Sequence, residues 1–535
     1  MTEPPAAEDH IEVEWQFSAF DVRPVARWLA NTSIPGYTVE PGPTKHLHDV
    51  YYDTADWRLH RAGFTCRVRQ KASSAELTLK SMAAAVDAVR SRREINDPLP
   101  AGETLPGAAR GPSAAIVTAL IGRQPLAPIF ELRTERQIFN LSDQTGSLAE
   151  IALDVTTIPV GEDVPVRLSR VEVEVEATAV GRAQPFADLM TAAMGLAPAI
   201  TSKFESALVA TGHRIPSFPP DLGPDAVTDD MTAAEAAYAI LRRQFALVLS
   251  NEAGTRLGED AEHLHDMRVA TRRMRAAMSA FREYVPRAEP YRRELGWLAG
   301  VLGAVRDLDV QVQNLAAWRN TFPSVQADAF ASIEKTLNVQ RDRMRARMLA
   351  ALDSRRYARM VERITAWLRR GPPRSYSAGA ERVLAVGPSI IERRYRRLRR
   401  HGDAIGPRSA PAAYHALRID GKKLRYALEF LAPIYGRRSA EFARRVTALQ
   451  DVLGLHQDAE VAISSLEALA HGARPRLQPD ALLAIGALCE RYRQQAETLR
   501  GEFPAVYRPL LGAEWRRLRH TMESCKPAPQ LRTTG

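Results

Sequence analysis

The hydrophobic and polar positions follow two different periods along the chain. In the first part, apolar and polar residues alternate in short runs, most clearly at 11–17, 64–69, 76–80 and 171–176. This alternation predicts β-strands, each with one apolar and one polar face. In the second part, apolar residues recur at every third or fourth position, which predicts amphipathic helices. We therefore expect an α+β multidomain protein with a strand-rich domain followed by an all-α helical bundle.

A stretch rich in proline and glycine separates the two patterns. We predict a first domain at 1–211, a linker at 212–231, a helical domain at 232–525 and a disordered tail at 526–535. Further breaks at glycine and proline divide the helical domain. The predicted helices cover 232–253, 262–284, 291–318, 325–369, 380–400, 412–435, 438–470 and 479–500.

The helical part also repeats internally. Residues 265–281 align without a gap with 415–431, and 301–310 align with 452–461 at nearly the same offset. A spacing of about 150 residues is too long for a solenoid repeat, so it indicates a duplicated helical subdomain with pseudo-twofold packing.

Charge divides the chain in the same way. The 535 residues carry a formal net charge of +10, from 73 Lys and Arg against 63 Asp and Glu. Up to residue 215 we count 21 basic and 27 acidic residues, so the excess of positive charge belongs to the helical part. A field of one sign implies an anionic partner there, such as nucleic acid, a membrane surface or polyphosphate.

Composition excludes several classes of protein. The chain has three scattered cysteines, no long apolar run and an acidic, proline-bearing start. These features argue against a disulfide framework, a structural zinc site, a membrane span and a signal peptide. We expect a cytoplasmic protein without a membrane partner.

Charged residues share one face of each predicted strand. They are Glu12 and Glu14, Arg67 and Arg69, Glu76 and Lys80, and Glu172, Glu174 and Glu176. The common interpretation is a sheet with one face in water. The alternative is a closed barrel with a charged interior, because paired carboxylates suit a hard divalent cation and paired guanidinium groups suit phosphate oxygens.

Eight short motifs over the first 210 residues decide how we interpret this domain. They are IEVEW, YYDTADWRLHRAGFTCRVR (51–69), ELTLK (76–80), SRREI (91–95), RTERQIF (133–139), EIALD (150–154), VEVEVE (171–176) and SKFESAL (202–208). In this order they resemble CYTH domains, which are triphosphate-tunnel metalloenzymes. Such enzymes hydrolyse inorganic or thiamine triphosphate, or cyclise ATP.

The resemblance implies an antiparallel β-barrel with a defined set of site residues. Mg²⁺ or Mn²⁺ would be held by Glu12, Glu14, Glu172 and Glu174. Catalysis would involve Glu12, Glu14 and Asp154, the last lying near the metal or the attacking water. The triphosphate would be bound by Arg67, Arg69, Lys80, Arg92, Arg136 and Lys203. The expected reaction is hydrolysis of inorganic triphosphate to diphosphate and phosphate.

One position departs from the family pattern. The opening motif Glu-x-Glu-x-Lys of the family here ends in Gln16. A neutral amide cannot supply the ammonium group that helps to hold the triphosphate. Two hypotheses stay open: a working triphosphatase, and a non-catalytic polyphosphate-binding or granule-associated protein with a degenerate tunnel. The identity of the triphosphate and the preferred metal also stay open.

Each helical repeat carries a stripe of cations. The stripes are His265, Arg268, Arg272 and Arg275 in the first copy, and His415, Arg418, Lys422 and Arg425 in the second. A solvated helix face explains most basic stripes, but duplication of the same order favours a binding surface. Aromatic residues interleave thinly and no nucleic-acid motif occurs, which argues against nucleic acid as the partner.

The doubled His-x-x-Arg motif within 228–525 resembles the CHAD domain, a helical domain often found behind CYTH. The resemblance implies binding of inorganic polyphosphate by the two stripes, with association with polyphosphate granules in some members.

Overall fold

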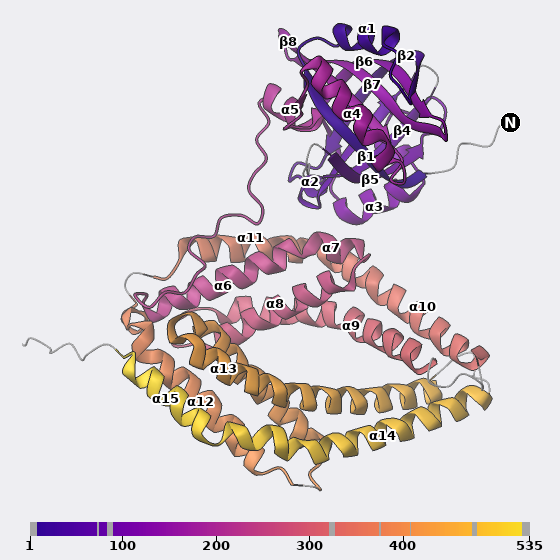
Figure 1. The fold of residues 1–535 in the computed structure, drawn as a ribbon. Helices are drawn as coiled ribbons and strands as arrows, with labels where there is room; N and C mark the ends of the chain where they lie inside the picture. Colours follow the sequence, from indigo (N-terminus) through magenta and orange to yellow (C-terminus); the bar gives the residue numbers. More distant parts are fainter. Residues whose placement is uncertain are drawn as a thin grey trace, which may run out of the picture. The chain divides into compact units, whose positions relative to one another are not determined.

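A computed structural model describes residues 8–71, 74–82, 89–319, 327–373, 376–406, 408–472 and 479–526. The chain divides into two compact units, 1–218 and 219–535. This boundary falls within the predicted linker (Figure 1). Beyond Lys526, the predicted tail lies outside the described residues.

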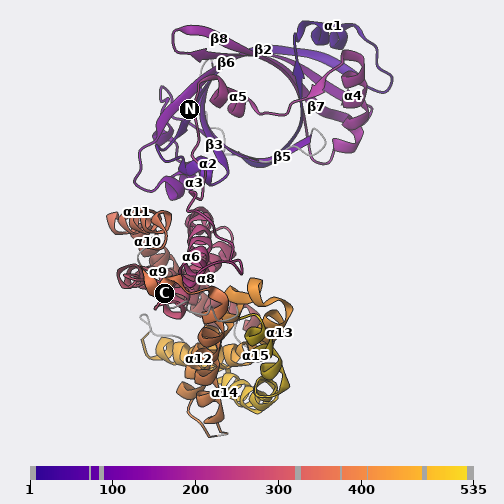
Figure 2. The same ribbon diagram turned by 90° about the vertical axis from the view of Figure 1, so that its left-hand side faces the viewer.

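The first unit is a closed antiparallel barrel. Its strands are β1 (Glu8–Ala19), β2 (Thr38–Asp53), β3 (Phe64–Gln70), β4 (Ala75–Ser81), β5 (Val89–Pro98), β6 (Ala127–Asp143), β7 (Gly146–Val160) and β8 (Asp163–Val175). They follow the order β5-β4-β3-β2-β6-β7-β8-β1, and β1 pairs back with β5 to close the ring, which Figure 2 shows end-on. The short β9 (Ala197–Pro198) adds to β1. The predicted barrel is confirmed.

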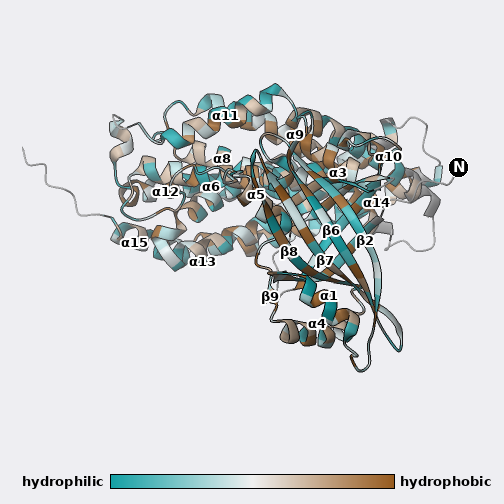
Figure 3. Ribbon diagram, turned by 90° about the horizontal axis from the view of Figure 1, so that it is seen from above, coloured by the Kyte–Doolittle hydropathy of each residue, from teal (hydrophilic) through white to brown (hydrophobic). Residues whose placement is uncertain are grey.

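The barrel is apolar outside and charged inside. Trp15 and Phe17 of β1 face outward and are buried under α1 (Arg23–Asn31) and α4 (Val180–Met194), which contribute Leu29 and Phe186 to the same core. The alternation along β6, β7 and β8 is visible in Figure 3. Because successive side chains of a strand point to opposite faces, burying the apolar face under helices directs the charged face into the barrel.

This unit also contains the helices α2 (Arg58–Arg61), α3 (Pro112–Ile121) and α5 (Lys203–Ala210). Ser202 begins α5, because its hydroxyl accepts a hydrogen bond from the Glu205 amide while the Glu205 carboxylate accepts one from the Ser202 amide. This capping box places Lys203 at the first helical position, beside the barrel interior.

The second unit is helical. Its helices are α6 (Ala233–Ser250), α7 (Glu252–Leu257), α8 (Ala261–Ala280), α9 (Glu289–Arg319), α10 (Ala327–Leu352), α11 (Arg355–Arg370), α12 (Val383–Asp403), α13 (Pro411–Gly472), α14 (Pro479–Tyr507) and α15 (Ala513–Ser524). The prediction of one helix over 325–369 is wrong. Ser354 starts a new helix there, because its hydroxyl accepts a hydrogen bond from the Tyr357 amide at 3.2 Å. The predicted break within α13 is present at Gly436, whose φ of 61° is non-helical.

The two repeats pack against each other through α8 and α13. Arg272 Nε donates a hydrogen bond to Tyr426 Oη at 2.7 Å, and the neighbouring Arg273 pairs with Glu429. Helix α9 also reaches the second half of α13, where Gln311 Nε2 donates to Ser465 Oγ at 3.3 Å. The stripe-bearing helices of the two copies are therefore direct neighbours.

Candidate functional site

A cavity of about 1300 Å³ occupies the barrel, lined by residues of all eight barrel strands and of α5. Its polar lining consists mostly of carboxylates, guanidinium groups and ammonium groups. Except for the fully buried Asp154, every tunnel residue predicted from the sequence lines this cavity directly. The lining members of that set are Glu12, Glu14, Arg67, Arg69, Lys80, Arg92, Arg136, Glu172, Glu174 and Lys203.

The first of three charge clusters in the cavity centres on Lys80. Its ammonium group pairs with Glu12, lies 3.1 Å from Glu94 Oε2 and lies 3.7 Å from Glu14 Oε1. Arg92 pairs with Glu14. Burial alone would lower the pKa of Lys80, but Glu12 and Glu94 outweigh that effect and raise it. The cluster therefore holds Lys80 charged.

The second cluster links β6, β7, β8 and α5. Arg136 donates two hydrogen bonds to Asp154, at 2.8 and 2.7 Å, and a third to Glu172 at 2.7 Å. Lys203 pairs with Asp154 and lies 2.9 Å from Glu172 Oε1. Burial would raise the pKa of Glu172, yet Lys203 and Arg136 hold it well below its ordinary value. Asp154 is 0 % exposed, so it contacts the cavity through Arg136 and Lys203.

The third cluster orients the two arginines of β3. Arg69 binds Asp49 with both ends of its fork, at 2.7 and 2.8 Å, and Arg67 lies 3.5 Å from the same carboxylate. Arg67 also lies 3.8 Å from Glu94. Both guanidinium groups are thus fixed in direction before any ligand binds.

Gln16 bridges two of these clusters. Its amide nitrogen donates hydrogen bonds to Glu14 Oε1 at 3.0 Å and to Glu172 Oε1 at 3.1 Å. The residue that departs from the family motif therefore still connects the strands β1 and β8, as a neutral donor.

The carboxylates beside this bridge fit a divalent cation. Glu174 lies opposite Glu14 on one side and Glu150 on the other in the strand register. It has no ion-pair partner in the described part of the chain, and burial, followed by the negative charge of Glu12, raises its pKa. Oxygen donors of this kind are the ligands that Mg²⁺ and Mn²⁺ prefer. Glu12, Glu14 and Glu172 are within the same lining but already contact cations or Gln16.

A compact metal-type cluster occurs elsewhere. In the described part of the chain, the side chains of Glu262, His265 and Asp266 of α8 form a group of His, Cys, Asp or Glu residues whose possible metal-ligand atoms all lie within 4.8 Å of one another. The tunnel carboxylates are instead dispersed among Lys80, Arg92 and Lys203.

The sequence prediction missed several members of the charge clusters. Asp49 and Glu94 organise Arg67, Arg69 and Lys80, and neither belongs to the site residues predicted from the sequence. A signal was present, since the runs KHLHDVYY and VRSRREIN alternate as the other strands do. Further charged lining residues outside the predicted set include Lys45, Arg90 and Glu150.

The cation stripes of the helical unit lie in a different environment. Burial, together with the positive charges of Arg418 and Arg272, lowers the pKa of Lys422 to about 7. Within the described residues, neither Lys422 nor Arg418 has an ion-pair partner, and the Nε atoms of Arg275 and Arg418 are buried without a hydrogen-bond partner. The second copy of the stripe therefore faces cations of the first.

Glycines of the two repeats lie beside the stripe arginines. A Cβ on Gly303 would lie 3.5 Å from Arg268, and one on Gly454 would lie 4.0 Å from Arg418. These glycines occupy matching positions of the two repeats. Four residues further on, Asp307 lies 3.5 Å from Arg268. The histidines lie at the helix ends, and His415 Nδ1 is 2.5 Å from Gln457 Oε1.

The geometry defines a two-part protein: an antiparallel barrel with a charged tunnel, followed by a duplicated helical domain with facing cationic stripes. Comparison with family models gives the family. The CYTH domain model matches residues 23–189 and the CHAD domain model matches residues 239–467, so the chain belongs to the proteins that carry a CYTH domain followed by a CHAD domain. The CYTH family includes triphosphatases, and its tunnel enzymes are metal-dependent. The match starts after β1, which carries Glu12 and Glu14, and ends before Lys203.

Some of the similar proteins match both domains of this chain, and others match one domain. An uncharacterized protein of Mycobacterium tuberculosis is 28% identical over 548 residues, covering 95% of this chain and 98% of its own length. The CHAD domain of the plant Ricinus communis is 26% identical with a TM-score of 0.43, covering 60% of this chain and 100% of its own. A Hippeastrum protein described as an adenylyl cyclase with a dominant triphosphatase activity is 15% identical with a TM-score of 0.26, covering 37% and 95%.

None of the described helices combines the length and the apolar character that a membrane crossing requires.

Proposed function

We propose that the barrel hydrolyses inorganic triphosphate to diphosphate and phosphate with Mg²⁺ or Mn²⁺, and that the helical domain binds inorganic polyphosphate. The observation that carries the first part is the cavity, in which basic and acidic side chains from all eight strands face one another. Phosphoryl transfer requires mainly positioning and neutralisation of charge, and this lining supplies both.

Each side chain has a role that follows from its contacts. We expect Glu12, Glu14, Glu172 and Glu174 to hold the cation, which would neutralise phosphate oxygens when bound. The phosphate chain would be bound by Arg67, Arg69, Lys80, Arg92, Arg136 and Lys203. The oxygen of a water molecule attacks the terminal phosphorus of the triphosphate. The new P–O bond forms as the bridging P–O bond breaks, and diphosphate leaves. Asp154 orients Arg136 and Lys203 toward the substrate.

Phosphate release from inorganic triphosphate tests this activity. We expect release by the wild-type protein with Mg²⁺ and little without it. Glu12→Ala removes one cation ligand and should reduce release by about a hundredfold or more. Glu135→Ala is the matched control, because Glu135 lies on β6 with its side chain exposed outside the barrel. Equal release by the wild type and Glu12→Ala would contradict the proposal.

Gln16 supports a second candidate, a tunnel that binds phosphate chains without cleaving them. An uncharged donor between Glu14 and Glu172 gives the substrate one cation less than the family motif does. The same assay separates the two candidates, since a binding-only tunnel retains triphosphate on the protein with no metal-dependent release.

Polyphosphate binding by the helical domain is supported by Arg418 and Lys422 of the second stripe, which have no ion-pair partner in the described part of the chain. Lys422, Arg418 and Arg272 repel one another when no anion is present, as the lowered pKa of Lys422 indicates. A phosphate chain along them would remove this repulsion. Affinity should fall steeply with salt, because binding releases counterions from the polyanion. Binding that survives Arg272→Glu/Lys422→Glu unchanged would exclude the stripes as the site.

A further inference from the structure

Helix α12 carries a strongly basic outward face that the stripes do not include. We call it the α12 face and define it as Ser389, Arg393, Arg396, Arg397, Arg400 and His401. These residues line a shallow hollow of about 750 Å³ together with Glu392. They recur at intervals of three and four, so they share one side of the helix. The opposite side holds the buried residues Ile391, Tyr395 and Leu398.

Cations outnumber carboxylates on this face. Arg393 pairs with Glu283 at 2.8 Å and Arg396 with Glu392 at 2.8 Å. Three basic side chains share the carboxylate of Asp420, which lies 3.0 Å from Arg397, 2.6 Å from His401 and 3.9 Å from Lys423. Arg400 has no ion-pair partner in the described part of the chain. The guanidinium side chain of Arg396 remains 72% exposed, so it is open to an external anion.

The α12 face is separate from the stripes. At about 100° per residue along α13, Arg418 and Lys422 share one side, whereas Asp420 and Lys423 lie on the far side. Arg397 and His401 contact this far side through Asp420. The helical unit therefore has cationic surfaces on opposite sides of α13.

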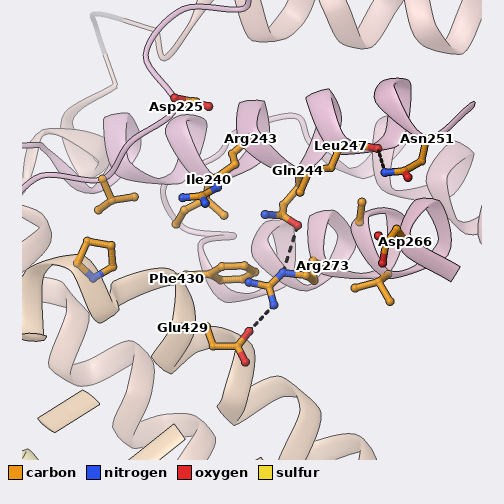
Figure 4. A pocket seen from close by; sticks show the side chains of 14 residues that line it. Asp225, Ile240, Arg243, Gln244, Leu247, Asn251, Asp266, Arg273, Glu429 and Phe430 are labelled. Carbon is orange, nitrogen blue, oxygen red and sulfur yellow. Dashed lines mark hydrogen bonds and ion pairs between the residues drawn. The ribbon is translucent and has the colours of Figure 1, made fainter. Parts of the chain in front are cut away.

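The duplication provides an internal comparison. At the offset of 150 residues, Arg396, Arg397 and Arg400 correspond to Ala246, Leu247 and Ser250 of α6. The corresponding place in the first copy is a smaller pocket of about 350 Å³ (Figure 4).

In that pocket the central cation is already neutralised. Arg273 lies between Gln244 and Glu429, with apolar walls that include Ile240 and Leu247. The excess of positive charge thus belongs to the second copy alone and does not follow from the shared packing of the repeats.

The chemistry of the α12 face favours phosphate groups without bases or acyl chains. The aromatic residue of α12, Tyr395, lies on the opposite, buried side with 4% exposure, and no described residue of α12 is an exposed large hydrophobic. Base stacking and insertion into a lipid interface therefore lack the side chains that they need. Guanidinium groups on successive turns match a linear chain of phosphate oxygens.

We propose that the α12 face is a second binding surface for inorganic polyphosphate, so that one protein molecule holds two chains, or two segments of one chain, on opposite sides of α13. This inference rests on the proposed binding of polyphosphate by the stripes. A bivalent binder cross-links long chains, which a protein with one surface does not do.

Calorimetric titration of the full-length protein with a short inorganic polyphosphate, in EDTA, measures the number of bound chains. Arg396→Glu/Arg400→Glu should bind one chain fewer than the wild type. The control Arg355→Glu/Arg359→Glu makes the same charge change at the same spacing on the exposed side of α11 and should bind as the wild type does. Because a glutamate at position 396 would repel Glu392, Arg396→Gln/Arg400→Gln is measured as well, with thermal unfolding of every variant.

The outcomes separate the two claims. Arg272→Glu/Lys422→Glu should lose the other chain and keep binding at the α12 face. If that variant loses all binding, or if the α12 variants bind as many chains as the wild type, the second surface is excluded while the proposed stripe function stands. If the wild type binds no polyphosphate, both fail. If the α12 variants lose binding of duplex DNA but not of polyphosphate, the surface is a nucleic-acid site and the inference is wrong.

A light-scattering measurement with long-chain polyphosphate gives a second readout. The wild type and the α11 control should form large assemblies near equivalence, and the α12 variants should not. Equal scattering by all three proteins would contradict cross-linking through this face.

Discussion

The barrel cavity and the helical stripes both gather cations, but they differ in what faces those cations. In the cavity, Arg136 and Lys203 contact Asp154 and Glu172 at hydrogen-bond distance. In the stripes, Lys422 has no ion-pair partner among the described residues, and after burial the positive charges of Arg418 and Arg272 lower its pKa. The cavity is balanced before any ligand arrives, whereas the stripes are not.

This difference implies two kinds of phosphate recognition. An anion entering the cavity must replace carboxylates as the partner of each cation, and a metal ion bound by those carboxylates makes the exchange favourable. The cavity should therefore select a ligand that comes with a divalent cation. The stripes gain from any polyanion of suitable shape, so they should discriminate less and depend more on salt.

The largest expected difference is in stability. Arg136→Ala removes one of the two cations that contact Asp154 and Glu172 inside the barrel, so the free energy of unfolding should fall by about 3–5 kcal/mol. Arg133→Ala, on the opposite face of β6 where its side chain is 67% exposed, should cost less than about 1 kcal/mol. Urea unfolding of both variants checks this. Equal small losses would show that the cavity pairs do not carry the stability assigned to them.

Removing a charged group from the stripe should not lower the stability in this way. Lys422→Met removes a largely buried ammonium group that faces cations, so the free energy of unfolding at pH 7 should stay the same or rise. Affinity for polyphosphate should fall by about tenfold, the loss of one charge-assisted contact. A large loss of stability in this variant would mean that Lys422 has a structural partner, and the contrast with the cavity would not hold.

Lys422 also predicts a pH dependence. Its pKa in the folded protein is about 7, below the ordinary value of 10.5, so between these values the unfolded chain binds more protons than the folded one. The free energy of unfolding therefore rises as the pH increases across this interval. Bound polyphosphate favours the protonated amine, so affinity falls over the same interval. Titrations of the wild type and Lys422→Met at several pH values check both trends, and identical profiles would exclude Lys422 as their source.

The smallest expected effect concerns Gln16. In Gln16→Lys an ammonium group would replace the amide between Glu14 and Glu172, as in the family motif. A charge-assisted contact to the triphosphate is about twice as strong as a neutral one, so KM should fall about fivefold with little change in stability. Gln70→Lys, on β3 and outside the cavity lining, is the control. Steady-state kinetics on inorganic triphosphate would show an unchanged KM if Gln16 does not contact the substrate.

Local pattern predicted much of this architecture, and long-range pairing explains the remainder. The alternation of Glu12 and Glu14 with Val13 and Trp15 was enough to assign the two faces of β1. The matched stripes of α8 and α13 followed from periodicity and repetition. Both depend on residues a few positions apart, which a single sequence shows directly.

The partners of those side chains could not be predicted in the same way. Asp49 on β2 orients Arg69 on the neighbouring strand β3. Asp154 on β7 orients Lys203, which lies 49 residues further along the chain at the start of α5. The end of the long predicted helix at Ser354 depends on one hydroxyl that competes with the helix pattern. Such features are set by tertiary contacts and by capping.

We expect hydrolysis and polyphosphate binding to depend on different residues of one molecule. The test is to measure Mg²⁺-dependent phosphate release and polyphosphate affinity on the same preparations of Glu12→Ala and Arg272→Glu/Lys422→Glu. We expect the first variant to lose hydrolysis of inorganic triphosphate and to bind as many polyphosphate chains as the wild type, and the second to keep hydrolysis and to bind one polyphosphate chain fewer. Loss of both properties in both variants, or of neither in either, would contradict the assignment of hydrolysis to the barrel and of polyphosphate binding to the stripes.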